Sequence, residues 1–119
     1  MLNFPPSVRI FICTQPTDMR KSFDGLSMRA EYVVGLNPRS GHLFVFINKP
    51  GDKLKILYWD RDGYAVWYKR LEKGTFLVPA STGEKLEVSA MDLAMILDGI
   101  DLSSIKRRKR FSLSSSLTE

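Results

Sequence analysis

Residues 41–79 read GHLFVFINKPGDKLKILYWDRDGYAVWYKRLEKGTFLVP, and this stretch decides the fold. It contains three runs rich in β-branched and aromatic side chains, a composition typical of strands, at residues 42–48, 53–60 and 64–72. Turn sequences separate the runs, so the stretch predicts an antiparallel β-meander. Residues 76–78 are expected to add a short strand before Pro79 ends the pairing.

The turns of this meander contain the residues that tight turns need. Asn48-Lys49-Pro50-Gly51-Asp52 predicts a type II turn, because proline presets the first corner and glycine accepts the positive φ of the second. Asp60-Arg61-Asp62-Gly63 predicts another turn, with Gly63 in the left-handed region. The run from Leu43 to Ile47 is apolar throughout, which predicts a central strand covered on both faces.

The segments before the meander predict one strand and one helix. Residues 8–12 have the composition of a strand, and Thr17 or Asp18 is expected to cap a helix that runs to about Val34. Apolar residues recur at spacings of three and four along this helix, which predicts a stripe facing the sheet. The residues of that stripe are Met19, Phe23, Leu26, Ala30 and Val33.

The segments after the meander predict a short edge strand and a second helix. The strand is expected at residues 85–88, and the helix over residues 90–98, with Ser89 as its N-cap and Gly99 beyond its end. The fold class is therefore α+β: an antiparallel β-meander of about four to six strands packed against one longer and one shorter helix. Residues 1–104 are expected to form one domain, and residues 105–119 a flexible tail that is basic and then serine-rich.

The excess positive charge lies in that tail. The chain has 18 lysine and arginine residues against 13 aspartate and glutamate residues, and its net charge is +5. Five of the basic residues form the run Lys106-Arg107-Arg108-Lys109-Arg110. The rest of the chain is therefore balanced, and a basic run of this kind indicates a polyanionic partner such as DNA.

The sequence predicts a cytoplasmic protein without a membrane partner. The longest apolar run, at residues 43–47, is far shorter than the roughly 20 residues that cross a bilayer. The first six residues lack the basic start and apolar core of a signal peptide. Cys13 is the sole cysteine, so no disulfide can form within the chain.

Enzyme chemistry has little support in the sequence, and no cofactor is expected. His42, the sole histidine, is interpreted as a strand-entry residue, and Cys13 as an inert thiol. A metal-dependent nuclease would need Asp60 and Asp62 together with Asp18 or Asp24, but turn chemistry explains Asp60 and Asp62 more simply. Phosphate-binding and dinucleotide-binding motifs are absent from the sequence.

DNA binding has two candidate surfaces. The first is the basic run, which could neutralise several phosphates. The second is a basic face of the meander, where Lys53 and Lys55 are expected to lie across from Lys69. Arg70 is also considered for contact with DNA. Trp59 and Trp67 are expected on that same face, where they could stack bases or simply pack.

Four strings of sequence carry a resemblance to a known family. They are TDMRKSFDGL from residue 17, GHLFVF from residue 41, DKLKILYWD from residue 52, and KRLEKGTF from residue 69. In this order they resemble the TnpB-type accessory protein of the insertion-sequence-66 family of bacterial transposable elements, over residues 8–99. The resemblance implies a small non-catalytic protein that is encoded beside a separate transposase and assists transposition.

The resemblance supplies no catalytic residues, so two functions stay open. The first is binding of DNA through the basic residues. The second is a protein-protein module that docks and positions the transposase without contacting DNA. The residues considered for docking are those of the first family string and two methionines of the second helix, namely Asp18, Met19, Arg20, Lys21, Met91 and Met95.

Overall fold

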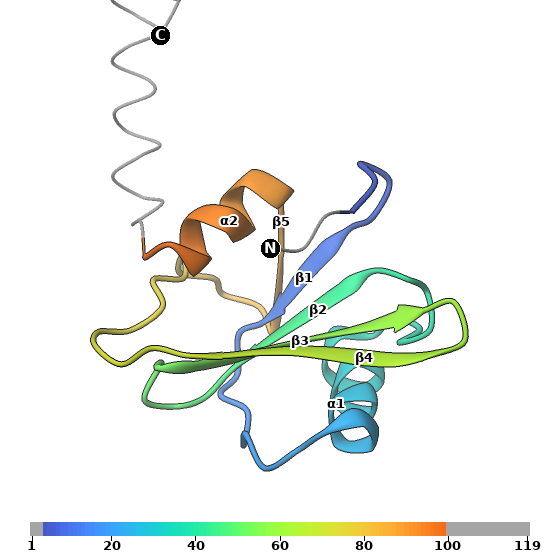
Figure 1. Cartoon of the computed structure of the whole chain (residues 1–119), viewed down its shortest axis with the longest axis horizontal. Coiled ribbons are helices and arrows are strands. Elements are labelled where there is room, and N and C mark those ends of the chain that lie inside the picture. Colours follow the sequence, from blue (N-terminus) through green and yellow to red (C-terminus); the bar gives the residue numbers. More distant parts are fainter. Residues whose placement is uncertain (1–3, 100–119) are drawn as a thin grey trace, which may run out of the picture.

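The computed structural model of the protein describes residues 4–99 and has a five-stranded sheet with the order β4-β3-β2-β1-β5. Figure 1 shows the helices on opposite sides of this sheet. The strands are β1 (Ile10–Cys13), β2 (Leu43–Ile47), β3 (Lys53–Asp60), β4 (Gly63–Arg70) and β5 (Lys85–Val88). The helices are α1 (Phe23–Arg29), which continues as the π-helical segment η1 (Ala30–Val34), and α2 (Ala90–Leu97).

The α+β class is confirmed, but the sheet is mixed, so the prediction of an antiparallel sheet is wrong for one pair. β1 runs parallel to β2, and all other neighbours are antiparallel. The parallel pair arises because α1 connects β1 to β2, and a helical crossover returns the chain in its original direction. β5 is an edge strand at residues 85–88, as predicted.

The expected strand at residues 76–78 does not form. Phe76 is buried instead, and its N–H donates a hydrogen bond to the carbonyl of Gly51 at 2.8 Å. The aromatic ring therefore contributes to the core while the chain leaves the sheet.

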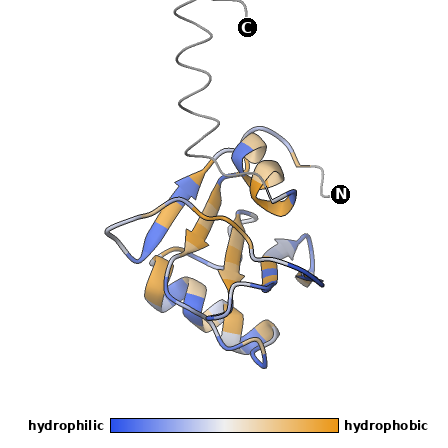
Figure 2. Ribbon diagram, turned by 90° about the vertical axis from the view of Figure 1, so that its left-hand side faces the viewer, coloured by the Kyte–Doolittle hydropathy of each residue, from blue (hydrophilic) through white to orange (hydrophobic). Residues whose placement is uncertain are grey.

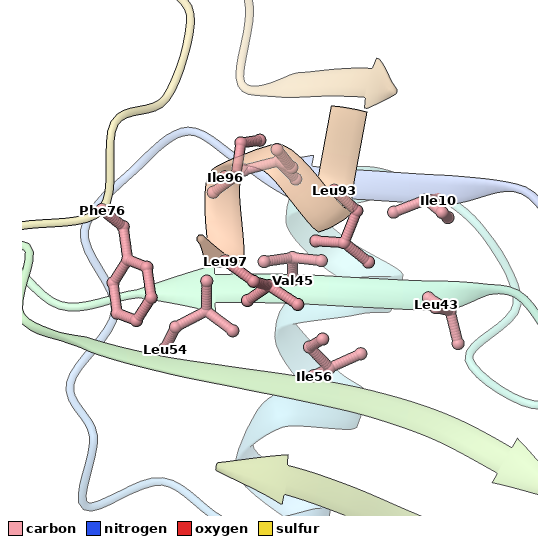
Figure 3. Close-up of a cluster of buried hydrophobic side chains, with 10 residues drawn as sticks. Ile10, Leu43, Val45, Leu54, Ile56, Phe76, Leu93, Ile96 and Leu97 are labelled. Carbon is pink, nitrogen blue, oxygen red and sulfur yellow. The ribbon is translucent and has the colours of Figure 1, made fainter. Parts of the chain in front are cut away.

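Each face of the sheet carries its own hydrophobic core. On one face, Leu93, Ile96 and Leu97 of α2 pack against the sheet, as Figure 3 shows. On the other face, Phe44 and Phe46 of β2 belong to a second core. The helical residues of this core are Leu26 of α1 and Ala30 and Val34 of η1. In Figure 2 the inner strands are coloured mostly hydrophobic. Residues 43–46 of β2 are all buried, which confirms the prediction of a central strand covered on both faces.

The first helix begins later than predicted. The N–H of Thr17 donates to the carbonyl of Ile47, and the carboxylate of Asp18 accepts from the N–H of Arg20, so both residues belong to a loop. α1 has 7 residues and η1 has 5, while α2 has 8, so the predicted contrast between a longer and a shorter helix is wrong. Phe23 was predicted to belong to the apolar stripe that faces the sheet, but its side chain is exposed.

Helix ends and turns largely follow the predicted residues. η1 ends at Val34 and is followed by Gly35, whose φ of +81° is left-handed. The Ser89 hydroxyl caps α2 by accepting a hydrogen bond from the N–H of Asp92 at 3.0 Å. Gly51 has the predicted positive φ, +84°. In the second turn the positive φ belongs to Arg61 at +55°, so the assignment of the left-handed position to Gly63 is wrong.

Residues 100–119 lie outside the described part of the chain, and the predicted tail from residue 105 lies there. Within residues 4–99, no helix has the length and apolar character needed to cross a bilayer.

Candidate nucleic-acid interface

The register of the β3–β4 hairpin decides which basic residues share a face. Lys53 pairs with Arg70, and Lys55 pairs with Tyr68, so these four side chains lie on the α1 side of the sheet. Lys69 pairs with Leu54, which belongs to the core on the α2 side. The prediction that Lys69 lies across from Lys53 and Lys55 on one face is therefore wrong.

Lys69 has a structural contact on the opposite face. Its Nζ atom donates a hydrogen bond to the carbonyl oxygen of Leu97 at 3.3 Å. This carbonyl lies at the C-terminus of α2, where the helix dipole favours a cation. Lys69 therefore stabilises the docking of α2 on the sheet.

The two tryptophans also lie on different faces. Trp67 packs against the α2 core. Trp59 makes an edge-to-face contact with Tyr64 at 5.0 Å between ring centroids, and the guanidinium of Arg39 lies 4.9 Å above the Trp59 ring. Both tryptophans are thus engaged by protein groups, and the prediction that they share a face is wrong.

Lys55 is buried, with an exposed fraction of 7%. Its ammonium group donates hydrogen bonds to the carbonyl oxygens of Met19 at 2.8 Å and Lys21 at 2.7 Å. The same ammonium lies 4.7 Å from the centroid of the Tyr68 ring. Carbonyl dipoles and an aromatic face therefore hold this charge, and among residues 4–99 no carboxylate pairs with it.

Two adjoining hollows border Tyr68, whose ring is in contact with Lys55. The larger, of about 480 Å³, is lined by Asp18, Met19, Arg20, Asn48, Lys53 and Tyr68. The smaller, of about 400 Å³, is lined by Lys53, Tyr68, Arg70 and Glu72. Because Lys53 and Tyr68 border both hollows, we treat them as one surface and call it the basic groove.

The basic groove brings together residues from three of the four family strings. Asp18 to Arg20 come from the loop before α1, Lys53 from the start of β3, and Arg70 from the end of β4. The groove thus brings together Lys53 and Arg70, two residues of the predicted DNA-binding set. The same geometry places Arg20, considered for docking, beside them.

Two ion pairs shape the charge of the groove. Arg20 binds Asp18 at 2.6 Å, and Arg70 binds Glu72 at 3.0 Å. The hydrogen bonds from Arg20 lower the pKa of Asp18 to about 2, so this carboxylate is ionised at neutral pH. Lys53 has no carboxylate partner within residues 4–99, and with Lys55 below it the groove has a positive excess.

The residues considered for enzyme chemistry have structural contacts. His42 accepts a hydrogen bond at Nδ1 from the N–H of Arg9 at 2.9 Å, which fixes the start of β2. Cys13 is buried, and its Sγ lies 3.4 Å from a guanidinium nitrogen of Arg29. Within residues 4–99, no three side chains of histidine, cysteine, aspartate or glutamate are grouped to hold a metal ion.

The two methionines of α2 differ in their surroundings. Met95 is partly buried against the core, whereas Met91 has an exposed fraction of 59%. Met91 borders an apolar hollow of about 560 Å³ at the start of α2. The other apolar residues of this hollow include Phe4, Val8, Leu43 and Leu93.

Tyr68 is a site residue that the sequence analysis missed. The alternation of residues along β4 does not by itself indicate a binding role for Tyr68. In the structure its side chain borders both hollows of the groove and has an exposed fraction of 50%. A two-residue hairpin loop fixes the register of its strands, so the pairing of Lys55 with Tyr68 could have been derived from the sequence. Lys106 to Arg110 lie outside the described residues, and their role stays a prediction.

Comparison with known proteins identifies relatives of this chain. A family model described as "IS66 Orf2 like protein" matches residues 8–107. The uncharacterized protein y4hO of Sinorhizobium fredii (strain NBRC 101917 / NGR234) is 40% identical over 101 residues, which cover 85% of this chain and 88% of the relative. The uncharacterized protein y4jC of the same strain is 33% identical over 101 residues, which cover 85% and 86%. No solved structure matches this chain at a significant level.

Proposed function

Because this chain belongs to the IS66 Orf2-like family of insertion-sequence accessory proteins, we propose that it binds DNA and assists a separate transposase. The single observation that carries the proposal is the basic groove. Lys53 and Arg70 lie on adjacent strands on one face, with Arg20 at the same surface. Cationic side chains gathered in this way suit contacts with a phosphate backbone.

The charge of the groove supports this partner. Lys55 adds a buried positive charge beneath the surface, and no carboxylate of residues 4–99 pairs with it or with Lys53. Arg20 and Arg70 are each held by an exposed carboxylate, which sets the direction of the guanidinium. An incoming phosphate would compete with these two carboxylates for the guanidinium groups, whereas Lys53 has no carboxylate partner among residues 4–99. The basic run at Lys106 to Arg110 is proposed to add contacts that do not depend on DNA sequence.

The test is fluorescence anisotropy with labelled DNA from the end of the element, over a series of salt concentrations. The double variant Lys53→Gln/Arg70→Gln is expected to bind more weakly, and to reduce the slope of log K against log salt by about 2, near 1 for each phosphate that is no longer neutralised. A matched control, Arg39→Gln/Arg61→Gln, removes the same charge at the other end of the hairpin. This control is expected to bind like the wild type.

A further variant separates the tail from the groove. Replacing all five residues Lys106 to Arg110 by glutamine in the full chain is expected to weaken binding to every DNA sequence alike. If both the groove variant and the tail variant bind like the wild type, these residues do not contact DNA. If the wild type binds no DNA at modest salt, the DNA-binding function is wrong.

A second candidate function is docking of the transposase, and the apolar hollow at the start of α2 favours it. Its lining is mostly hydrophobic, and the ion pair between Arg9 and Glu87, at 2.7 Å, lies at its border. An apolar centre with a polar rim is the usual anatomy of a protein interface. The partner proposed for this hollow is the transposase of the same element.

Co-purification of the two proteins without DNA tests this function. Met91→Glu is expected to abolish the complex by placing a charge at the hollow. Met28→Glu is the matched control, because Met28 is exposed to a similar extent, 56%, on α1. An equal effect of both variants, or no complex with the wild type, would exclude this hollow as the docking site.

A further inference from the structure

We propose that the basic groove binds unpaired DNA, with one base stacked on the ring of Tyr68. This inference rests on the proposed function and deepens it by naming the form of DNA. The observation behind it is the position of an exposed aromatic ring in the middle of a cationic surface. Tyr68 borders both hollows, whereas Arg20 borders one and Arg70 the other.

The exposure of Tyr68 sets it apart from its neighbours. Among the described aromatic side chains of β3 and β4, Tyr68 alone is exposed, at 50%. Trp67 packs in the core of the α2 side, and Trp59 is in contact with Arg39 and Tyr64. An aromatic face is therefore available to a ligand at one position of the hairpin, and that position is in the groove.

The ring of Tyr68 is held in place before any ligand arrives. The ammonium of Lys55 lies 4.7 Å from the ring centroid, and two main-chain carbonyls fix that ammonium. A cation over an aromatic face stabilises the ring in one orientation. Ligand binding would thus cost little side-chain entropy, because the ring is already ordered.

The place of β4 in the sheet leaves room for a ligand. Within residues 4–99, β4 is an edge strand, so no described strand covers its outer side. Just after β4, the N–H of Leu71 donates a hydrogen bond to the carbonyl of Asp52 in the β2–β3 turn. A nucleic-acid strand can therefore lie along this edge with its backbone near Lys53 and Arg70.

The pairing of cations with an aromatic ring favours single strands over duplex. In a duplex the faces of the bases are stacked on each other, so a side chain such as Tyr68 finds no partner there. Unpaired bases expose their faces, and proteins that bind single strands combine a positive groove with aromatic stacking platforms. A duplex would use only the cations of the groove.

The experiment compares binding of a labelled single-stranded oligonucleotide and of its matching duplex to the full chain. Tyr68→Leu is expected to weaken binding of the single strand by about 10-fold or more, as removal of one base stack does, and to leave duplex binding nearly unchanged. Tyr68→Phe keeps the aromatic face and is expected to bind like the wild type. Tyr32→Leu, which alters another exposed tyrosine at 75%, is the control.

A second measurement keeps the proposal falsifiable if Tyr68→Leu proves unstable. A single strand containing 5-iodo-deoxyuridine is irradiated with the wild-type protein, and the cross-linked peptide is sequenced by mass spectrometry. A cross-link at Tyr68 is expected. A cross-link only elsewhere, or duplex binding as tight as single-strand binding with no effect of Tyr68→Leu, would overturn the proposal and leave DNA binding by the groove intact. Absence of binding to either form would instead overturn the proposed function.

Discussion

The Nζ atom of Lys55 lies 2.7 Å from the carbonyl oxygen of Lys21, so a buried ammonium on β3 binds the main chain just before α1. A second carbonyl, that of Met19, lies at 2.8 Å. This contact joins two segments that are 34 residues apart in the sequence. It also places the first family string against the hairpin that contains the third.

Replacing Lys55 should therefore lower the free energy of unfolding, because its side chain joins these two segments. We expect Lys55→Met to lower the free energy of unfolding by about 1–3 kcal/mol, because two carbonyls lose their donor. Lys53→Met is the matched control on the same strand and face, and its effect should stay within about 0.5 kcal/mol. Urea denaturation measures both. Equal losses for the two variants would show that the carbonyl contacts contribute nothing.

Asp18 is expected to restrain DNA binding, because it holds Arg20 in an ion pair. Asp18→Asn keeps an oxygen that can accept from the N–H of Arg20 but releases the guanidinium to a phosphate. We expect higher affinity and a salt slope steeper by about 1. Asp24→Asn removes the same charge on α1 and serves as control. Anisotropy measurements in which both variants gain affinity equally would indicate a general charge effect instead.

The carboxylate of Asp18 also makes the stability of the protein depend on pH in the acidic range. The pKa of Asp18 falls from 3.8 to about 2 in the folded protein, so its ion pair contributes stability above the unfolded pKa. That contribution is lost as the pH falls from about 4 to about 2. The difference in Tm between wild type and Asp18→Asn should therefore be constant above pH 5 and shrink below pH 4. A difference that stays constant down to pH 2 would contradict this cause.

The cap of α2 gives a test that is independent of the groove. Ser89→Ala removes the hydroxyl that accepts from Asp92 and should lower the free energy of unfolding by about 1 kcal/mol. Ser89→Asp supplies another oxygen and should retain most of the stability. Thermal unfolding compares them. If both variants lose the same amount, capping is not the reason for the loss.

Shortening a side chain to alanine should change the free energy of unfolding by different amounts on the two sides of α2. Ile96 is fully buried, so Ile96→Ala is expected to cost about 2–5 kcal/mol through lost burial and a cavity. Met91 is largely exposed, so Met91→Ala should change the free energy of unfolding by less than about 1 kcal/mol. Guanidinium denaturation gives both values. A large loss from Met91→Ala would mean that this side of the helix is also needed for folding.

Local signals in the sequence predicted much of the fold. The bounds of β3 at residues 53–60 are as predicted, because a Pro-Gly turn precedes it and apolar and charged residues alternate along it. Ser89 and Gly99 bracket α2 as predicted for a capped helix. The parallel pairing of β1 and β2 was not predicted, although the order strand, helix, strand is its usual signal. The turn residues of the meander indicate only pairing between neighbours in sequence.

The site was harder to predict, because it depends on tertiary contacts. A lysine in a strand is normally exposed, so nothing local indicated that Lys55 would be buried against main-chain carbonyls. The late start of α1 has the same origin, since Thr17 and Asp18 have helix-capping side chains but form tertiary and turn contacts instead. By contrast, the faces of Lys53, Lys69 and Tyr68 follow from the hairpin register, and were predictable from the turn alone.

The position of β1 between β2 and β5 also constrains the order in which the protein can fold. Ile10 pairs with Leu43 on one side and with Val88 on the other, so β1 brings the two ends of the described chain together through its pairing with β5. The β3–β4 hairpin has a short loop and can form early, whereas β1 gains its second neighbour only after Val88 has been synthesised. Until then one edge of β1 stays open to pairing with other chains. We therefore expect newly made chains to be most prone to aggregation just before β5 and α2 close the sheet.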